Sequence, residues 1–470
     1  MSKIKKSWFE VDRDGLRELQ ENKPKSYILR ELIQNAWDED ITTCEVFMSW
    51  TDGLASISVI DDSPEGFRDL RHAYTLFAPT YKRAEPEKRG RFNLGEKQIL
   101  SICEEAYIST TKGTITFTKN GREESKACRE AGSFIQISVK MSKKDYNEIY
   151  EVIKTYLPPA HIKFTLNYEP YHHHTPDKTF EAILPTEFEE NGIFHKTRRK
   201  TIIDLHISEH PYLYEMGIPV TPIESKYSID VQQKIPLSTD RDTVPISYLK
   251  TLYAEVLNHT FKDLQPDESS EVWVRQAASS SKISEEAVKT VITKRYGEKV
   301  VVGNPRDRNS IDEAISQGFK VIHGRELSKD EWINVKRAEA VNSSSDLFPT
   351  KMVSGTYVEP TPGMLKYAEF AKKLAKRVFG INIEVKFTES EGVTAQYGDR
   401  TLTLNVKATG KAFFESLTVP LLDLTIHELS HEHGNHTQYT YHQACTRLGA
   451  ELTIIALKDP GFFNLDMSQL

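Results

Sequence analysis

Near the C-terminus, the segment HELSH contains two histidines that are spaced to bind one metal ion. On a helix, His427 and His431 lie one turn apart on the same face, so both imidazoles can reach one Zn²⁺. Glu428 lies between them and can take a proton from a zinc-bound water, which would make it catalytic. The alternative is a helix with exposed histidines. The apolar residues around the motif and the histidine-rich segment after it favour a metal site.

A catalytic zinc ion usually takes three protein ligands and leaves one position open. Four residues that follow the two motif histidines are candidates for the third ligand. These are His433, His436, His442 and Glu451.

A second set of polar residues interrupts an apolar helical pattern in ELIQNAWDE. Glu31, Asn35 and Asp38 lie at i, i+4 and i+7, which is one face of a helix. The carbonyl oxygen of Asn35 suits Mg²⁺, because hard cations prefer oxygen ligands. Glu31 could then orient and deprotonate an attacking water. A polar stripe that faces solvent is the alternative.

Two loops complete this second set. In VIDDSPEGF, an aspartate at the end of a strand could accept a hydrogen bond from an adenine amino group, with Asp61 and Asp62 both open and Gly66 in the turn. An ordinary Asp-Ser-Pro turn is the alternative. In RFNLGEK, a glycine loop runs into an apolar helix, and backbone N–H groups at a helix N-terminus bind phosphate. The candidates there are Arg91, Asn93, Leu94, Gly95, Glu96 and Lys97.

Together and in this order, the three segments resemble the N, G1 and G2 boxes of the GHKL ATPases, which include gyrase, ATP-driven chaperones, histidine kinases and MutL. The resemblance implies an α/β sandwich (the Bergerat fold) that binds ATP and Mg²⁺. It also maps the family's later threonine to Thr201 and a phosphate-contacting lysine to Lys234. Ser63, Glu65 and Asn93 stand where the family has glycines, which leaves open whether ATP is hydrolysed or only sensed.

The C-terminal motif with its Gly-Asn turn resembles the SprT/WLM group of minimal metalloproteases. The resemblance implies a zincin-like domain in which His427, His431 and His436 bind Zn²⁺, with His442 as the fallback for the third ligand. It also implies that the strand RTLTLNV, at 400–406, is the edge strand that pairs with an extended substrate.

The elements around these residues alternate helix and strand patterns, which predicts an α+β multidomain protein. SYILRELIQNAWDE is amphipathic with a helical period, and LASISVIDD alternates as a strand does. The predicted organisation is a GHKL ATPase domain over 1–210, a transducer-like segment over 211–265, a small α/β unit over 266–340, a linker over 341–360 and a zincin-like metalloprotease domain over 361–470.

Composition narrows the setting. The net charge of −7 gives no global basic field, and no residue pattern supports nucleic acid as a partner. Four cysteines without a CxxC pair are typical of a reducing compartment. The N-terminus lacks the apolar core of a signal peptide, and no apolar run is long enough to span a membrane. We therefore expect a cytoplasmic protein without a membrane partner.

The two sets of residues predict an ATP-regulated zinc metalloprotease that acts on a protein substrate of unknown identity. ATP binding would close or dimerise the N-terminal domain and so gate the zinc site. The alternative is a non-proteolytic GHKL ATPase that clamps protein or nucleic acid and holds only a structural zinc.

Overall fold

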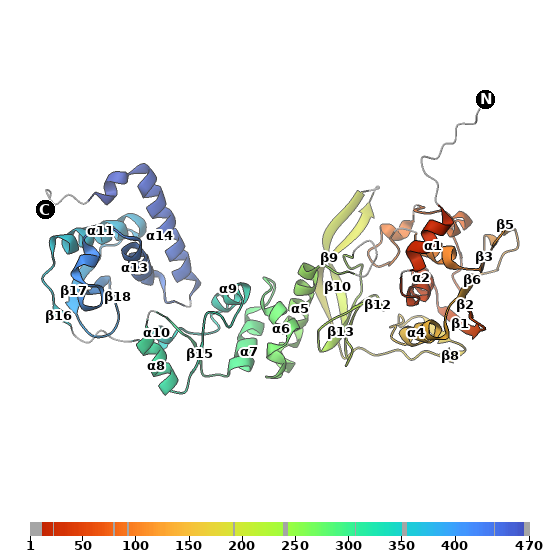
Figure 1. The fold of residues 1–470 in the computed structure, drawn as a ribbon, viewed down its shortest axis with the longest axis horizontal. Helices are drawn as coiled ribbons and strands as arrows, with labels where there is room; N and C mark the ends of the chain where they lie inside the picture. Colours follow the sequence, from red (N-terminus) through yellow and green to blue (C-terminus); the bar gives the residue numbers. More distant parts are fainter. Residues whose placement is uncertain are drawn as a thin grey trace, which may run out of the picture. The chain divides into compact units, whose positions relative to one another are not determined.

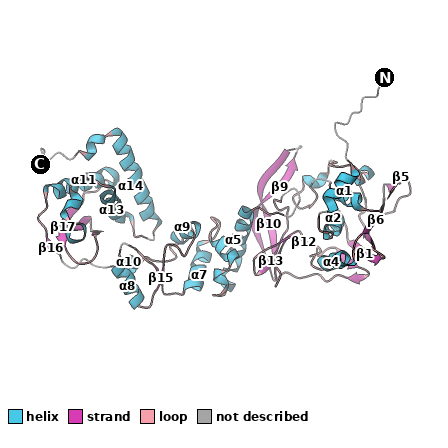
Figure 2. Cartoon of the chain, viewed as in Figure 1, coloured by secondary structure: helices cyan, strands magenta, loops and turns pink. Residues whose placement is uncertain are grey.

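The structure, a computed structural model, describes residues 12–21, 23–78, 80–91, 94–190, 193–237, 243–305, 307–349, 355–436 and 438–464. The chain divides into two compact units, Met1–Leu249 and Lys250–Leu470 (Figure 1). Each unit combines helices with sheets (Figure 2), which confirms the predicted α+β multidomain class. Among the described residues, no helix has the length and apolar character needed to cross a bilayer.

The first unit is built on an eight-stranded sheet with strand order β5-β4-β3-β6-β2-β1-β7-β8. Its strands are β1 (Thr43–Thr51), β2 (Leu54–Asp61), β3 (Glu105–Thr110), β4 (Gly113–Thr118), β5 (Gly121–Ser125), β6 (Phe134–Lys140), β7 (Lys163–Leu166) and β8 (Glu169–Pro170). The β1–β7 pair is parallel and the other pairs are antiparallel. The α-helices that accompany it are α1 (Arg13–Glu21), α2 (Ser26–Trp37), α3 (Gly95–Ile102) and α4 (Lys143–Ile153).

Helix α2 packs its apolar side on this sheet and so fixes the polar residues of the same helix. Ile28, Leu32 and Ile33 are buried in one core with Ile57 and Val59 of β2. Alternation along β2 buries every second residue, and Asp61 continues this inward-facing series at the end of the strand. The hydrophobic pattern thus directs both α2 and Asp61 toward one side of the sheet.

A second sheet in the first unit has the order β12-β11-β13-β10-β9. Its strands are β9 (Lys178–Glu190), β10 (Ile193–Ile207), β11 (Tyr212–Glu215), β12 (Ile218–Pro222) and β13 (Tyr227–Val231). The predicted boundary at residue 210 therefore falls between two strands of one sheet.

The second unit begins with helices that surround a two-stranded parallel sheet. Its elements up to residue 349 are α5 (Ile246–Thr260, which starts just before the unit boundary), α6 (Val272–Ala278), α7 (Glu285–Tyr296), β14 (Val300–Val302), α8 (Arg308–Ser316), β15 (Lys320–Ile322), α9 (Lys329–Arg337) and α10 (Ser344–Leu347). The order helix, strand, helix, strand agrees with the pattern in the sequence. Helix α10 lies in the range 341–360 that was predicted to be a linker.

The rest of the second unit is a four-stranded sheet with order β16-β17-β19-β18, accompanied by helices. The elements are β16 (Thr356–Tyr357), α11 (Pro362–Phe379), β17 (Glu384–Glu389), β18 (Ala395–Gly398), β19 (Thr401–Asn405), α12 (Val406–Thr409), α13 (Val419–Ser430) and α14 (Tyr439–Lys458).

The expectation that the strand at 400–406 forms the edge of this sheet is wrong. Strand β19 pairs with β17 on one side and with β18 on the other, so β18 is the edge among the described strands. The reason is a tight hairpin: Asp399 and Arg400 both have positive φ, at 48° and 56°. Two such residues fold a chain back in the turn that suits the twist of paired strands.

Candidate functional site

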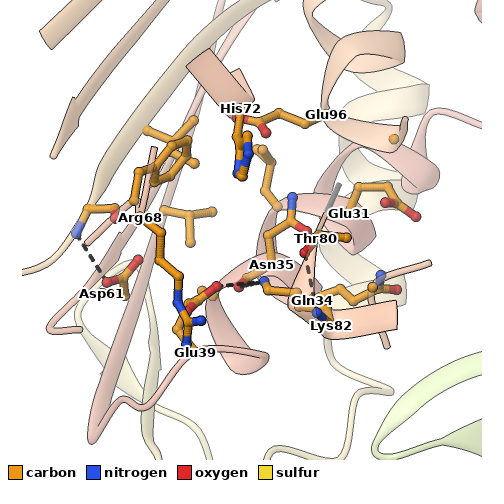
Figure 3. A pocket seen from close by; sticks show the side chains of 18 of the residues that line it. Glu31, Gln34, Asn35, Glu39, Asp61, Arg68, His72, Thr80, Lys82 and Glu96 are labelled. Carbon is orange, nitrogen blue, oxygen red and sulfur yellow. Dashed lines mark hydrogen bonds and ion pairs between the residues drawn. The ribbon is translucent and has the colours of Figure 1, made fainter. Parts of the chain in front are cut away.

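A cavity of about 320 Å³ in the first unit gathers half of the predicted nucleotide-site residues (Figure 3). Its walls come from α2, the end of β2, the start of α3 and the segment 80–91, which we call the pocket loop. Seven predicted residues line it: Glu31, Asn35, Asp61, Arg91, Leu94, Gly95 and Glu96. Asn93 lies outside the described residues.

Glu31 and Gly95 meet where α2 approaches the start of α3. Glu31 is 2% exposed, and a Cβ added at Gly95 would overlap its carboxylate. Glycine at this position therefore allows the N-terminus of α3 to reach α2. Asp38 is buried as well and Asn35 is half-buried, so the alternative of a solvent-facing polar stripe on α2 is wrong.

The two candidate aspartates have different surroundings. Asp61 lines the cavity, and its Oδ1 accepts hydrogen bonds from the backbone N–H groups of Ser63, at 3.0 Å, and Ser133, at 3.1 Å. Asp62 instead accepts from the backbone of Thr42 and Thr43 at the start of β1. Asp61, and not Asp62, is thus the aspartate that faces the cavity.

Burial raises the pKa of Asp61 to about 6, although the two backbone hydrogen bonds act in the opposite direction. At neutral pH the group is mostly ionised and acts as an acceptor. Ser133 stands beside Asp61 in the cavity wall. Sequence reasoning missed Ser133, because only the antiparallel pairing of β2 with β6 brings it there.

Three further predicted residues do not line the cavity but contact residues around it. They are Asp38, Gly66 and Lys97. Asp38 accepts from the backbone N–H groups of Arg89, at 2.9 Å, and Gly90, at 2.7 Å, and forms an ion pair with the Arg89 guanidinium. Burial would raise the pKa of Asp38, but Lys82, Arg89 and the backbone donors hold it below its usual value. Gly66 makes a turn with φ +57°, and Lys97 forms a buried ion pair with Glu96 at 3.3 Å.

Thr201 and Lys234 do not line the cavity. Thr201 lies on β10, opposite Ala182 of β9 in the second sheet. Lys234 is 1% exposed, and its ammonium donates to the backbone carbonyls of Lys82, at 2.5 Å, and Arg83, at 3.3 Å. The two positions that came from the resemblance alone are therefore not part of the cavity wall.

The pocket loop contributes further side chains to the cavity. Lys82 forms an ion pair with Glu39 at 2.7 Å, and the Tyr81 hydroxyl donates to the same carboxylate at 2.8 Å. The Arg68 guanidinium stacks over the Tyr81 ring. This stretch has no regular period, so no pattern in the sequence indicated which of its side chains face inward.

Three residues that line the cavity have a buried polar atom with no hydrogen-bond partner among the described residues. The atoms are Nε2 of Gln34, Nε of Arg91 and Oε1 of Glu96. An unsatisfied buried polar atom costs roughly 1–3 kcal/mol, which a polar ligand could recover. Together with Asp61, they give the cavity a polar wall that a polar ligand could contact.

In the second unit, the ring nitrogens of His427, His431 and His436 lie within 4.8 Å of one another. The Nε2 atoms of His427 and His436 are 3.1 Å apart. Ligands of a tetrahedral zinc ion with bonds of about 2.0–2.1 Å lie about 3.3 Å apart, so the spacing fits zinc. The predicted triad is brought together.

Local signals in the sequence shape this cluster. Helix α13 begins where the Thr418 side chain accepts from the Leu421 amide, with Pro420 in the first turn, and it ends at Ser430. Gly434 has φ +142°, and a side chain there would collide with that of Gln438. This glycine turns the chain so that His436 returns to the face of His427.

The second nitrogen of each ring also has a partner. Nδ1 of His427 lies 2.9 Å from the Tyr441 hydroxyl, and Nδ1 of His431 lies 3.2 Å from the Gly434 carbonyl. Nδ1 of His436 lies 3.6 Å from the Asp346 carboxylate. Such partners orient the imidazoles and direct Nε2 toward a metal.

Burial is the main cause that lowers the pKa of His431, to about 4, and the neighbouring His436 acts in the same direction. His431 is therefore neutral at pH 7, as a metal ligand must be. His442, the fallback ligand, is used otherwise, since its Nε2 donates to the backbone carbonyl of His436 at 2.8 Å. The His433 ring packs edge-on against the Phe379 ring.

Glu428 is buried, and its Oε1 lies 4.0 Å from Nε2 of His427. Both residues line a cavity of about 460 Å³ with the end of β18. Asp346 and Ser345 of α10 line it too. Sequence reasoning missed Asp346 and Tyr441, although Asp346 stands three residues after the helix-capping Ser343.

Neither a scan against protein-family models nor a search of curated proteins found a significant match to this chain. The assignment of function therefore rests on the geometry of the two sites.

Proposed function

We propose that the protein is a zinc metalloprotease regulated by ATP. The observation that carries the proposal is the convergence of three histidine nitrogens beside a buried glutamate at an open cavity. A structural zinc usually has four protein ligands and no open position. Three ligands beside a cavity support a catalytic site over the structural zinc of a non-proteolytic clamp.

In this proposal, His427, His431 and His436 hold zinc, which would polarise a water and a peptide carbonyl. Glu428 takes the proton of the attacking water and passes it to the leaving amine. Residues 393–397 line the same cavity, and the outer edge of β18 can accept an extended peptide as an added strand. The arrangement favours an extended polypeptide as substrate, in a zincin-like domain.

For the first unit we propose a GHKL-type nucleotide site. Asp61 accepts from the adenine amino group, the backbone at Gly95 faces the phosphates, and Asn35 supplies the oxygen that binds Mg²⁺. The polar atoms of Gln34 and Glu96 that lack partners support a polar ligand. Because both sites belong to one chain, we propose that nucleotide binding regulates cleavage, through closure or dimerisation of the ATPase part.

The test combines two variants in a peptide-cleavage assay with and without ATP. Glu428→Gln should lower cleavage by about 10²–10⁴-fold, the contribution of a general base, while zinc and ATP still bind. Asn35→Ala should abolish Mg-dependent ATP binding and alter cleavage, while zinc content stays unchanged. Cleavage that survives Glu428→Gln would contradict the protease assignment. Cleavage that is indifferent to nucleotide and to Asn35→Ala would contradict the regulation.

A further inference from the structure

Lys234 lies close to the nucleotide cavity, but its side chain contacts the protein backbone and does not line the cavity. It follows β13 and is among the largest fully buried side chains. Besides the two carbonyl contacts of its ammonium, its backbone N–H donates to the Pro86 carbonyl at 2.7 Å. Its own carbonyl accepts from the Thr186 hydroxyl at 2.8 Å. Burying an ammonium costs free energy unless the group is hydrogen-bonded. Here its hydrogen bonds go to the backbone of the pocket loop.

Ile235, the residue after Lys234, contacts Arg91 at the other end of the pocket loop. The Arg91 guanidinium forms a bidentate pair with Glu215, at 2.8 and 2.5 Å, and donates to the Ile235 carbonyl at 2.7 Å. The Ile235 N–H donates back to Glu215 at 2.7 Å. Bidentate, charge-assisted pairs are among the strongest and most directional hydrogen bonds in proteins. Lys234 and Ile235 thus hold the pocket loop at both ends.

Lys82 is the residue of the pocket loop that bears on ligand binding, because it lines the cavity. Its ammonium pairs with Glu39 and donates to the Asn35 carbonyl at 3.2 Å, next to the proposed magnesium ligand. Gly90 leaves room for the Lys82 stem, since a Cβ there would come within 3.0 Å of it. A lysine ammonium has three N–H donors, and these contacts use two of them. The third is available to a phosphate oxygen.

We propose that Lys234 is a positioning residue for nucleotide binding, which acts by fixing the backbone of Lys82, and that Lys82 is the lysine that contacts the phosphate chain. The proposal rests on the proposed ATP site. A direct contact between Lys234 and the phosphates would predict different ATP affinities for variants of Lys82 and Lys234.

The experiment measures ATP and adenosine affinity for Lys82→Met, Lys234→Met and the double variant of the full chain. Each single variant should lower ATP affinity by about tenfold, the effect of one charge-assisted hydrogen bond, and change adenosine affinity by less than twofold. The double variant should bind ATP no more weakly than Lys82→Met alone. Lys200→Met, an exposed lysine of β10, is the matched control and should leave both affinities unchanged.

Three results would overturn the proposal. Additive losses in the double variant would mean that Lys234 contacts the phosphates itself. Equal losses for ATP and adenosine would mean that Lys234 only maintains the fold. Unchanged ATP affinity in Lys82→Met would remove Lys82 from the site. If Lys234→Met does not fold, Lys234→Gln keeps a donor for one carbonyl and takes its place.

Hydrogen exchange without nucleotide separates this proposal from the ATP assignment itself. Lys234→Met should speed exchange of the amides over 82–90, whereas Lys82→Met should not. If the wild type binds no ATP, the proposed function fails, yet this difference still tests whether Lys234 holds the loop. If Lys234→Met leaves the exchange of these amides unchanged, Lys234 does not hold the pocket loop and the proposal is wrong.

Discussion

In the histidine cluster proposed as a metal centre, the three ring nitrogens come from residues 427–436, and two of their ring partners are Gly434, in the same stretch, and Tyr441, five residues after it. In the nucleotide cavity, the walls come from α2, β2, the pocket loop, α3 and the start of β6. The metal centre is thus largely local in the chain, whereas the cavity exists only once distant segments have packed. A local site can be recognised from spacing, and an assembled site only in part.

The largest expected effect concerns the choice of third zinc ligand. His436→Ala should weaken zinc binding by about 10²–10³-fold, since a zinc site with four ligands contributes roughly 10–16 kcal/mol in total. His442→Ala, which removes only a hydrogen bond to the His436 carbonyl, should cost less than about tenfold. Competition against a chromophoric chelator measures both. A larger loss of zinc affinity in His442→Ala than in His436→Ala would identify His442 as the third ligand.

Asp346 is the contact that makes the metal centre less local than its triad. Its carboxylate reaches His436 from α10, so Asp346→Ala should weaken zinc binding by about 10–100-fold, the usual effect of losing a ligand's outer partner. Asp312→Ala, an exposed position on α8, is the control and should have no effect. Full affinity in Asp346→Ala would show that residues 427–441 suffice for the centre.

The third prediction concerns Asp61 and its dependence on pH. Because burial raises its pKa to about 6 in the folded protein, from an ordinary value of 3.8, its contribution to stability is present below pH 3.8 and is lost as pH rises through 6. Asp61→Asn should therefore stabilise the protein above pH 6 by up to about 3 kcal/mol, at about 1.4 kcal/mol per pKa unit. The same variant should weaken ATP binding.

Thermal unfolding with chelator present, at pH 4.5 and pH 7.5, measures this difference and removes any contribution from zinc. A melting temperature that is raised equally at both pH values would contradict the assignment of the effect to the ionised carboxylate. Unchanged ATP affinity would remove Asp61 from the site and leave the cavity without its proposed adenine acceptor.

Much of the fold followed from periodicity. The alternation of β2 and the apolar side of α2 predicted which residues face the core, and both are buried as expected. The edge strand was misplaced, because the sequence does not show how far a hairpin such as the one at Asp399 and Arg400 folds back. The range 341–360 was predicted to be a linker on composition, yet its residues 343–346 support His436.

The sequence by itself determined the histidine triad, because helical spacing and a glycine turn are local properties of the backbone. It also determined that Glu31, Asn35, Asp61 and Gly95 belong together, through the order of three motifs. Only the tertiary structure decided between Asp61 and Asp62, added Ser133 and Lys82 to the cavity, and turned Lys234 toward the pocket loop. These outcomes depend on strand pairing and on contacts between distant segments, which one-dimensional spacing does not encode.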